Sequence, residues 1–269
     1  MPDEAGGILS KLVDAALAAT RERQRHLPIE RVLAAIPEAA PLSFMQALST
    51  PAINIIAEIK YASPGKGRNH CSLPPGIIGR MYAGNGAAAV SVLTERRYFQ
   101  GSLESLSRLA SEGLPIPILR KDFIVDDYQV AEARAAGASS YLLIAALLAG
   151  RGLSRLIGYG RQLRMEPLVE VHNLREMEAA LKAGARIIGV NNRNLGDLSI
   201  SLDTSFALAR EVEGSAEVVL VSESGISRRS QLLELRDAGF HGFLVGTALM
   251  AAPDPGVELS KLLRRTHVH

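Results

Sequence analysis

The chain has 269 residues, of which 47% are hydrophobic and 22% are charged. This composition is ordinary for a globular protein with a large core. Its 30 Lys and Arg residues against 28 Asp and Glu residues give a net charge of +2. That balance argues against a nucleic-acid or membrane surface and confines any positive potential to a local site.

Three further features bear on the compartment. Cys71 is the single cysteine of the chain, which excludes an internal disulfide framework and suits a reducing environment. The N-terminus, "MPDEAGGILS", is acidic and lacks the early apolar core of a secretory signal. The longest apolar stretch, "YLLIAALLAG" at 141–150, is too short to span a bilayer. We therefore expect a cytoplasmic protein with neither nucleic acid nor membrane as a partner.

Residues 1–52 are predicted to be helical. The helical segments are "ILSKLVDAALAATRERQRH", "IERVLAAI" and, after Pro41, "SFMQALS". No flexible linker or low-complexity tract separates them from the rest of the chain. We expect a helical N-terminal extension that packs on residues 53–269, over one end of that unit, so that the whole chain is one structural domain.

From residue 53 onward the sequence alternates between short aliphatic runs and helix-like stretches rich in Ala, Leu, Arg and Glu. The predicted strands are 53–59, 87–94, 115–121, 139–145, 166–171, 186–192, 217–224 and 242–249. Gly137, Gly184 and Gly239 each follow a predicted helix, at the position where a glycine commonly turns the chain into the next strand.

Strands that alternate with helices indicate βαβ units and a parallel sheet. Eight such units in about 215 residues are typical of a (β/α)8 TIM barrel. The structural alternative is an open, doubly wound sheet, whose site would be concentrated at one crevice. Polar residues here end five of the predicted strands, spread along the whole chain, which favours the closed barrel.

The active-site face of such a barrel is formed by the carboxyl ends of its strands. The candidate residues at these ends are Glu58, Lys60, Lys121, Glu170, Asn191, Arg193 and Glu223. Glu58 and Lys60 are two apart on one strand, so their side chains project to the same side. Lys and Glu held together in a partly dry pocket shift each other's pKa and suit proton transfer, while the same lysines also suit Schiff-base chemistry.

The last two strands add a signal for phosphate. Ser224 and Gly225 precede a helix predicted to start near Ser227, and Gly246 and Thr247 end the eighth strand. Glycine-rich loops after the seventh and eighth strands of a barrel expose backbone N–H groups that bind anions. No cluster of His, Cys and carboxylate residues has metal-ligand spacing, and His172 is interpreted as structural.

The ordered motifs "AEIKYASPGKG", "SVLTERRYFQGS", "ILRKDFIVDDYQV", "YLLIAALL", "PLVEVH", "GVNNRNL", "VSESGIS" and "FLVGTALM" resemble the indole-3-glycerol-phosphate synthase family of tryptophan biosynthesis, over residues 40–262. The resemblance implies a (β/α)8 barrel with a helical N-terminal extension and no metal or organic cofactor. It also implies a carboxy-lyase that converts 1-(2-carboxyphenylamino)-1-deoxyribulose 5-phosphate to indole-3-glycerol phosphate, with release of carbon dioxide and water.

The resemblance also implies roles for individual residues. Lys121 would be the general acid, oriented by Glu58, while Glu170 would act in acid–base steps and Lys60 would help the dehydration. The residues implied to bind the substrate are Asn191 and Glu223 at its hydroxyls, Arg193 and Ser63 near its carboxylate and phosphate, Phe99, Phe123 and Leu142 around its ring, and Ser224, Gly225, Gly246 and Thr247 at its phosphate.

The chain departs from the family pattern at Tyr61, where Arg or Lys is usual, and at Gly65, where "SPGKG" replaces "SPSKG". Both lie in the first loop and bear on its closure over substrate. Three other functions remain open: a paralogue that acts on a substituted substrate in secondary metabolism, a Schiff-base lyase with Lys121 as nucleophile, and an inactive scaffold. We expect a monomer or a weak homo-oligomer.

Overall fold

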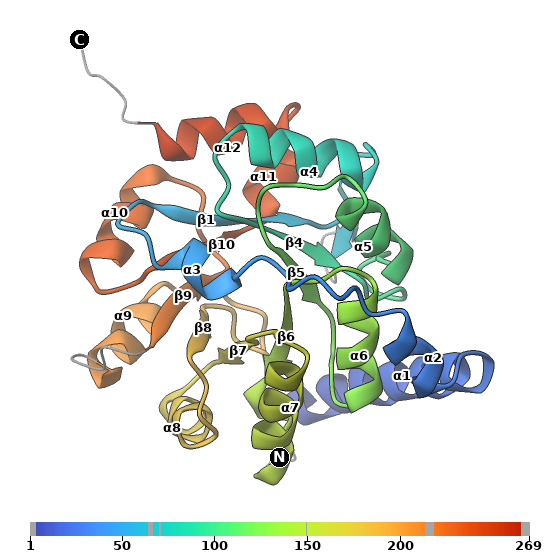
Figure 1. Ribbon diagram of the computed structural model, residues 1–269. Helices are drawn as coiled ribbons and strands as arrows, with labels where there is room; N and C mark the ends of the chain where they lie inside the picture. Colours follow the sequence, from blue (N-terminus) through green and yellow to red (C-terminus); the bar gives the residue numbers. More distant parts are fainter. Residues whose placement is uncertain (1–3, 64–66, 70, 149, 213–217, 265–269) are drawn as a thin grey trace.

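Eight parallel strands close into a barrel in the computed structural model, which describes residues 4–63, 67–69, 71–148, 150–212 and 218–264 (Figure 1). They are β1 Asn54–Ile59, β4 Ala89–Leu93, β5 Ile118–Lys121, β6 Ser140–Ile144, β7 Leu168–Val171, β8 Ile187–Asn191, β9 Val219–Glu223 and β10 Gly242–Val245. Each strand pairs with its neighbours in chain order, and β1 closes the ring by pairing with both β4 and β10. The predicted (β/α)8 fold is confirmed.

Helices surround the barrel on the outside (Figure 1). They are α4 Pro75–Gly84, α5 Leu103–Ala110, α6 Asp127–Ala135, α7 Arg151–Gln162, α8 Leu174–Lys182, α9 Asp203–Ala209, α10 Arg229–Asp237, α11 Thr247–Ala251 and α12 Pro255–Leu263, with short 3-10 turns η1 Ala145–Leu147 and η2 Arg210–Val212. A small hairpin, β2 Ala62–Ser63 and β3 Gly67–Arg68, follows β1. Side-chain oxygens of Ser102, Asp126 and Asn173 cap the starts of α5, α6 and α8.

The barrel strands are buried on both faces, which explains why their sequences are nearly continuous apolar runs. On β1, Ile55, Ala57 and Ile59 pack against the helical layer, whereas Ile56 belongs to the core inside the barrel. Alternate residues therefore point inward. The inward positions are apolar near the amino ends of the strands and become polar near the carboxyl ends, where the candidate site residues stand.

The helix α3 (Phe44–Leu48) lies at the amino ends of the strands and is drawn across the barrel in Figure 1. Phe44 and Leu48 join the inner core. Asn54, at the start of β1, donates hydrogen bonds to the carbonyls of Leu48 and His241, each at 2.9 Å. This helix therefore closes the mouth opposite the candidate site.

The first two helices, α1 (Glu4–His26) and α2 (Ile29–Ala34), lie on the flank of the barrel beside α6 (Figure 1). Val32 of α2 packs against Tyr128 and Ala131 of α6, and the Tyr128 hydroxyl donates to the Leu27 carbonyl at 2.8 Å. The sequence interpretation placed the whole extension over one mouth. Only α3 has that position, because α2 packs its apolar face on α6 and Arg23 of α1 pairs with Glu132 of α6.

Strand boundaries differ from the prediction chiefly at the last strand. The prediction ran from 242 to 249, but β10 ends at Val245 and α11 begins at Thr247. The aliphatic run continues across this boundary, so hydrophobicity alone does not mark where the strand stops. Gly137, Gly184 and Gly239 all have φ between +82° and +99°, as expected for glycines that end helices.

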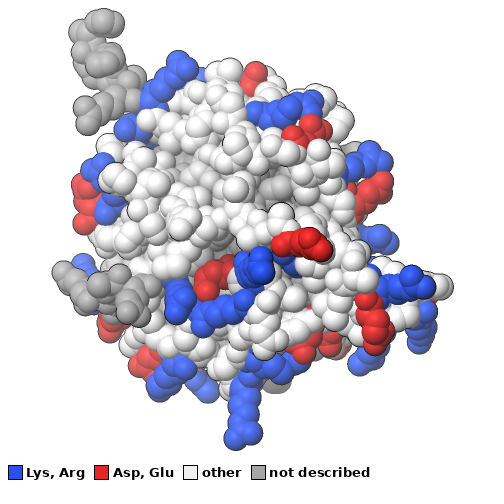
Figure 2. All heavy atoms as spheres, in the orientation of Figure 1, with Lys and Arg blue, Asp and Glu red and all other residues white. Residues whose placement is uncertain are grey.

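On the face shown in Figure 2, basic and acidic side chains lie together mainly around the rim and in the lower half, while the upper central part carries few charges. None of the helices in the described part of the chain is long and apolar enough to cross a membrane.

Candidate active site

Glu58 and Lys60 form an ion pair at the carboxyl end of β1. Nζ of Lys60 lies 2.9 Å from Oε1 of Glu58, whose residue is only 3% exposed. Burial alone would raise the pKa of Glu58, but Lys60 and Lys121 outweigh it and hold the pKa below its ordinary value. The two charges that interrupt this apolar strand thus point into the barrel and neutralise each other. Nζ of Lys60 also donates to the Thr247 hydroxyl at 3.4 Å.

Lys121 ends β5 and lies among carboxylates from three other strands. Its Nζ is 2.9 Å from Oε2 of Glu223 and 3.4 Å from Oε2 of Glu170. Burial would lower the pKa of Lys121, yet the charges of Glu223, Glu170 and Glu58 outweigh it and hold the pKa above its ordinary value. Lys121 is therefore a protonated ammonium in the free protein.

The expectation that Glu58 orients Lys121 is not met by direct contact among the described residues. Glu58 pairs with Lys60, its neighbour on the same face of β1, and Lys121 pairs with Glu223 and Glu170. Glu58 acts on Lys121 through its charge alone. The same-strand partner is the closer one, because residues two apart on a strand share a face.

The two carboxylates beside Lys121 differ in pKa. Burial would raise the pKa of Glu170, but Lys121 and His172 outweigh it, and the Asn191 amide donates to Oε1 at 3.0 Å, so the pKa lies below its ordinary value. Burial raises the pKa of Glu223 to about 7, although Lys121 opposes it. Oε1 of Glu223 has no hydrogen-bond partner in the described part of the structure. The pocket thus holds an ionised carboxylate and one that titrates near neutral pH.

Phe99, Phe123 and Leu142 provide apolar surface at the same end of the barrel. The Phe99 and Phe123 rings are 6.4 Å apart and inclined at 47°, a geometry common for aromatic pairs. Leu142, on β6, and Phe123 both contact the inner core. Phe99 belongs to the loop after β4.

A carboxylate organises that loop. Glu95 accepts hydrogen bonds from the backbone N–H groups of the three residues at 97–99, at 2.7 to 3.1 Å. Glu95 is 9% exposed, so its carboxylate is stabilised by these backbone N–H groups in place of solvent. It therefore fixes the position of Phe99.

The residues predicted to bind phosphate lie on the loops after β9 and β10. Ser224 and Gly225 have φ of +68° and +86°, so the chain takes a tight left-handed turn directly after Glu223. Asn192, buried beside it, donates to the carbonyls of Glu223 and Ser224 at 2.9 and 3.1 Å. Gly246 is buried, and Thr247 starts α11.

Three other predicted positions lie at the edge of this group. Ser63 is part of the β2–β3 hairpin. Arg193 donates through its guanidinium to the Leu198 carbonyl at 3.1 Å, within its own loop, and makes no ion pair among the described residues. Tyr61 donates to the Leu73 carbonyl at 2.8 Å and so ties the two ends of the first loop together. Gly65 lies outside the described residues.

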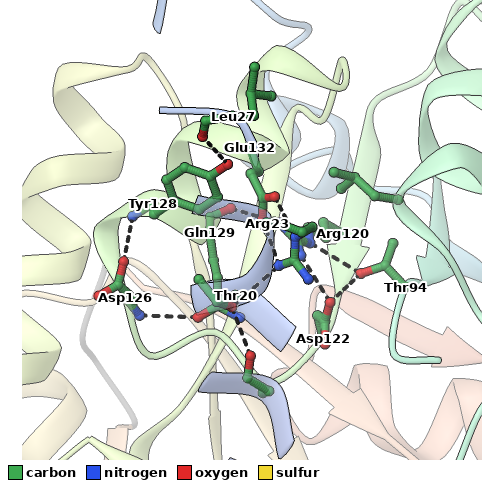
Figure 3. A network of polar contacts seen from close by, with 12 residues as sticks. Thr20, Arg23, Leu27, Thr94, Arg120, Asp122, Asp126, Tyr128, Gln129 and Glu132 are labelled. Carbon is green, nitrogen blue, oxygen red and sulfur yellow. Dashed lines mark hydrogen bonds and ion pairs between the residues drawn. The ribbon is translucent and has the colours of Figure 1, made fainter. Parts of the chain in front are cut away.

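A buried network supports the strand that carries Lys121 (Figure 3). Arg120, 1% exposed, donates to the Thr94 hydroxyl at 3.1 Å, to the Gln129 carbonyl at 2.7 Å and to Asp122 at 3.0 Å. Asp122 also accepts from Thr94 at 2.5 Å. Arg120 and Asp122 flank Lys121 in the sequence, and both bind Thr94. These contacts therefore join the carboxyl ends of β4 and β5.

The N-terminal helix reaches the same network. Arg23 of α1 makes two hydrogen bonds to Glu132 of α6, at 2.6 and 2.9 Å, and Glu132 lies 3.6 Å from Arg120 (Figure 3). Glu132 is 4% exposed. It is thus a buried carboxylate shared by two guanidinium groups, one from the barrel and one from the extension.

Several of these supporting residues were not singled out from the sequence. They are Glu95, Thr94, Arg120, Asp122, Asn192, Arg23 and Glu132. Arg120 could have been identified from the sequence, because a charge in the middle of a buried apolar strand requires a partner. The others lie in loops or on helices, where a polar residue is ordinary. In the described part of the chain, no group of three or more His, Cys, Asp or Glu side chains is placed to hold a metal ion.

A closed parallel barrel with ion-paired lysines and glutamates at the carboxyl ends of its strands has the architecture of a (β/α)8-barrel enzyme. The Indole-3-glycerol phosphate synthase family matches residues 9–262, and the chain belongs to that family. Its members are decarboxylating lyases of tryptophan biosynthesis.

Individual relatives agree. The chain is 44% identical to the indole-3-glycerol phosphate synthase of Carboxydothermus hydrogenoformans over 263 residues, which cover 95% of this chain and 99% of that protein. It is 41% identical to that of Lactiplantibacillus plantarum over 256 residues, covering 93% and 97%. With the enzyme of Roseiflexus sp. it shares 45% identity over 249 residues, covering 90% and 93%.

Solved structures with much lower identity share the fold. A thiamine phosphate pyrophosphorylase from Pyrococcus furiosus has a TM-score of 0.58 at 17% identity and covers 78% of this chain and 93% of its own. An N-acetylmannosamine-6-phosphate 2-epimerase from Clostridium perfringens has a TM-score of 0.60 at 16% identity, covering 79% and 93%. At this identity the likeness concerns the barrel alone.

Proposed function

We propose that this chain is an indole-3-glycerol phosphate synthase whose acid–base work is done by Lys121, Glu170, Lys60 and Glu58. The reaction closes a five-membered ring on 1-(2-carboxyphenylamino)-1-deoxyribulose 5-phosphate, then releases carbon dioxide and water. The observation that carries the assignment of roles is the position of Lys121, whose Nζ lies between Glu223 and Glu170 at the carboxyl ends of the strands.

Lys121 acts in the ring closure. The ring carbon that bears the carboxylate bonds to the sugar carbonyl carbon, and Lys121 gives its proton to the carbonyl oxygen, which becomes a hydroxyl. The bond between the ring carbon and the carboxylate then breaks, and carbon dioxide leaves. The electron pair of that bond stays with the ring and restores its aromaticity. An ammonium whose pKa is held up by three carboxylates is protonated before each turnover, so it has a proton to give to the carbonyl oxygen.

The dehydration needs a second acid and a base. Glu170, ionised in the free protein, accepts the proton from the carbon next to the ring nitrogen. Lys60 protonates the departing hydroxyl, which leaves as water. Glu58 neutralises Lys60 in the resting state and stabilises the positive charge that develops during ring closure.

The other predicted residues bind and orient the substrate. Phe99, Phe123 and Leu142 wall the aromatic ring, while Asn191 and Glu223 bind the hydroxyls. Arg193 and Ser63 lie toward the carboxylate and phosphate, and the phosphate is held by Ser224, Gly225, Gly246 and Thr247. Oriented binding of both ends brings the ring carbon close to the carbonyl, which is a large part of the rate enhancement available to a cyclisation.

The direct test uses the purified chain and synthetic substrate. Fluorescence should show the appearance of indole-3-glycerol phosphate, with one carbon dioxide released per product. A chelator should leave the rate unchanged. A folded chain that forms no product at saturating substrate would refute the proposal.

Borohydride distinguishes a general acid at Lys121 from a Schiff-base nucleophile. An amine nucleophile must be deprotonated, whereas the pKa of Lys121 is raised by its three carboxylates. Borohydride added during turnover should therefore leave the mass of the protein unchanged. A covalent adduct on Lys121 would assign it the nucleophilic role instead.

A further inference from the structure

His172 lies directly beyond β7, two residues after Glu170, and its imidazole stands between two carboxylates. Nε2 is 3.2 Å from Oε1 of Glu170, and Nδ1 is 2.9 Å from Oε2 of Glu176. The histidine side chain is 9% exposed, and that of Glu170 is 5% exposed. His172 was interpreted as structural from the sequence, and its contact with Glu170 was not predicted.

Glu176 is itself held in place. It stands in the first turn of α8, where the helix dipole favours a carboxylate. Its carboxylate accepts hydrogen bonds from the backbone N–H of His172 at 2.9 Å and from the Asn173 side chain at 2.7 Å. Asn173 in turn caps α8 by accepting from the N–H of Glu176 at 3.0 Å. The position of His172 is therefore set by the start of the helix that follows it.

The charges around His172 come from few elements. Glu170 of β7 and Glu176 of α8 face its ring. Asn191 of β8 contacts the same oxygen of Glu170 as the imidazole, and Lys121 of β5 contacts the other oxygen. Tyr141 is the titratable side chain of β6, and its hydroxyl donates to the Leu156 carbonyl, away from this site. The neighbouring turn η1 contributes none. On α8, Arg175, Glu178 and Lys182 are exposed.

Two carboxylates on one imidazole favour its protonated form. Burial would lower the pKa of His172, but Glu170 and Glu176 outweigh it and raise the pKa to about 10. At neutral pH the pair is thus an imidazolium beside a carboxylate. Nε2 has no aligned hydrogen-bond acceptor among the described residues, so its attraction to Glu170 comes from charge at close range.

We propose that His172 is a positioning residue for Glu170, and that Glu176 holds His172 in that position. The inference rests on the acid–base role proposed for Glu170. One oxygen of Glu170 faces Lys121, while the other faces Asn191 and the imidazole. His172 thereby keeps the carboxylate ionised and turned so that the oxygen next to Lys121 remains available to the substrate.

The first test needs no substrate. The chain contains six histidines, so the imidazole resonance of His172 can be assigned by its absence from His172→Gln in 15N-histidine NMR. In the wild type this ring should stay protonated beyond pH 8, and Glu176→Gln should bring its titration toward the ordinary range near 6.5. A wild-type ring that titrates near 6.5 would overturn the proposal, even if the enzyme variants fail to fold.

The second test measures kcat against pH for three variants. In His172→Gln, kcat should fall about ten- to a hundredfold, since a misplaced catalytic group costs that much, and the acidic limb of the profile should move to higher pH. Glu176→Gln should resemble the wild type at low pH, where its histidine is still protonated. It should approach His172→Gln as the pH rises through the neutral range. Glu178→Gln removes the same charge from the exposed face of α8 and should match the wild type throughout.

The outcomes separate the two proposals. If the wild type forms no indole-3-glycerol phosphate, the proposed function fails, while the NMR titration still tests the contact itself. If the wild type is active and His172→Gln keeps its kcat and acidic limb, the positioning role of His172 is refuted. A uniform loss of activity at every pH in Glu176→Gln, or a change in KM alone, would equally refute it, because a merely structural role predicts that pattern.

Discussion

A Cβ atom on Gly246 would overlap Oε1 of Glu58 and would lie 3.0 Å from the Glu58 Cβ. The two residues face each other because β10 and β1 are neighbours in the barrel, with Ala57 paired to Val245. The φ of Gly246 is −126°, which is not in the left-handed region that favours glycine. Glycine is therefore required here for space: the Glu58 carboxylate occupies the place of the missing side chain.

Gly246→Ala should accordingly damage chemistry. The sequence motifs assign Gly246 to the phosphate site, but the group nearest to an added side chain is Glu58, whose displacement breaks its pair with Lys60. We expect kcat to fall by about 10²-fold. Steady-state kinetics measures this, with Gly158→Ala in α7 as control, since a Cβ there meets no atom within 4 Å. A rise in KM at unchanged kcat would support the phosphate interpretation instead.

Lys121→Ala should abolish turnover in a folded protein. A positioned general acid contributes roughly 10² to 10⁴ in rate, and the substitution leaves Glu170 and Glu223 without their shared cation. Lys121→Arg is the stricter test, because it keeps the charge but does not release a proton near neutral pH. Circular dichroism melts establish that each variant is folded. A folded variant with more than about a tenth of the wild-type kcat would contradict the role of Lys121.

The stability of the protein should depend on pH through Glu223. Its folded pKa, about 7, lies above the ordinary value of 4.5. The folded state therefore holds this proton more tightly than the unfolded state. Its contribution to stability is fully present below pH 4.5 and is lost as the pH rises through 7. Glu170 acts in the opposite sense, since its depressed pKa adds stability that is lost as the pH falls below its ordinary value.

Melting temperatures from pH 5 to pH 8 test this directly. Glu223→Gln keeps the shape of the side chain but cannot ionise, so its melting temperature should decline less across this range than that of the wild type. The exposed Glu104, which forms an ion pair with Arg108 on the surface, provides the control Glu104→Gln. Parallel curves for all three proteins would show that Glu223 is ionised throughout, and the raised pKa would be wrong.

The barrel and the inward-facing acids and bases could be predicted because both depend on local patterns. Eight aliphatic runs separated by helical stretches specify parallel βαβ units, and the period of two along β1 places Glu58 and Lys60 on one face. Glu170, Lys121 and Glu223 follow the same rule at the ends of their strands. They meet in space because all carboxyl ends of a parallel barrel lie at one mouth.

The pairing among those residues could not be predicted in the same way. Which carboxylate approaches Lys121 depends on the order and stagger of strands around the barrel, and this order brings Glu223 to 2.9 Å while Glu58 turns to Lys60. The contact of His172 with Glu176 depends on where α8 begins. The space for Glu58 depends on a glycine 188 positions later in the chain, at Gly246.

The ion pair between the extension and α6 should stabilise the fold. Arg23→Met removes one of the two cations of Glu132, a carboxylate that is 4% exposed. Loss of one partner of a buried pair is costly, but Arg23 itself is partly exposed, so we expect the free energy of unfolding to fall by about 1–3 kcal/mol. Denaturant titration measures this loss. The double variant Arg23→Met/Glu132→Gln should lose less than the sum of the single changes.

The same helix supplies the control for that experiment. Arg25 and Glu22 also form an ion pair, but their side chains are 75% and 58% exposed. Arg25→Met should therefore change the free energy of unfolding by no more than about 0.5 kcal/mol. Equal effects of the two substitutions would mean that Arg23 acts through helix propensity or surface charge and that its contact with Glu132 is of little consequence.

Thr247→Val should weaken phosphate binding with little direct effect on the reacting carbons. The Thr247 hydroxyl stands at the start of α11 and accepts from Lys60 at 3.4 Å. Removing one donor to a charged acceptor costs about 1–3 kcal/mol, so KM should rise by roughly 5- to 150-fold. Some of kcat should be lost as well, since remote binding energy helps to place the ring. Thr247→Ser keeps the hydroxyl and should remain close to the wild type. Inorganic phosphate should compete with substrate in the wild type and in Thr247→Ser, and much less in Thr247→Val. If phosphate competes equally well in all three, the phosphate does not contact Thr247.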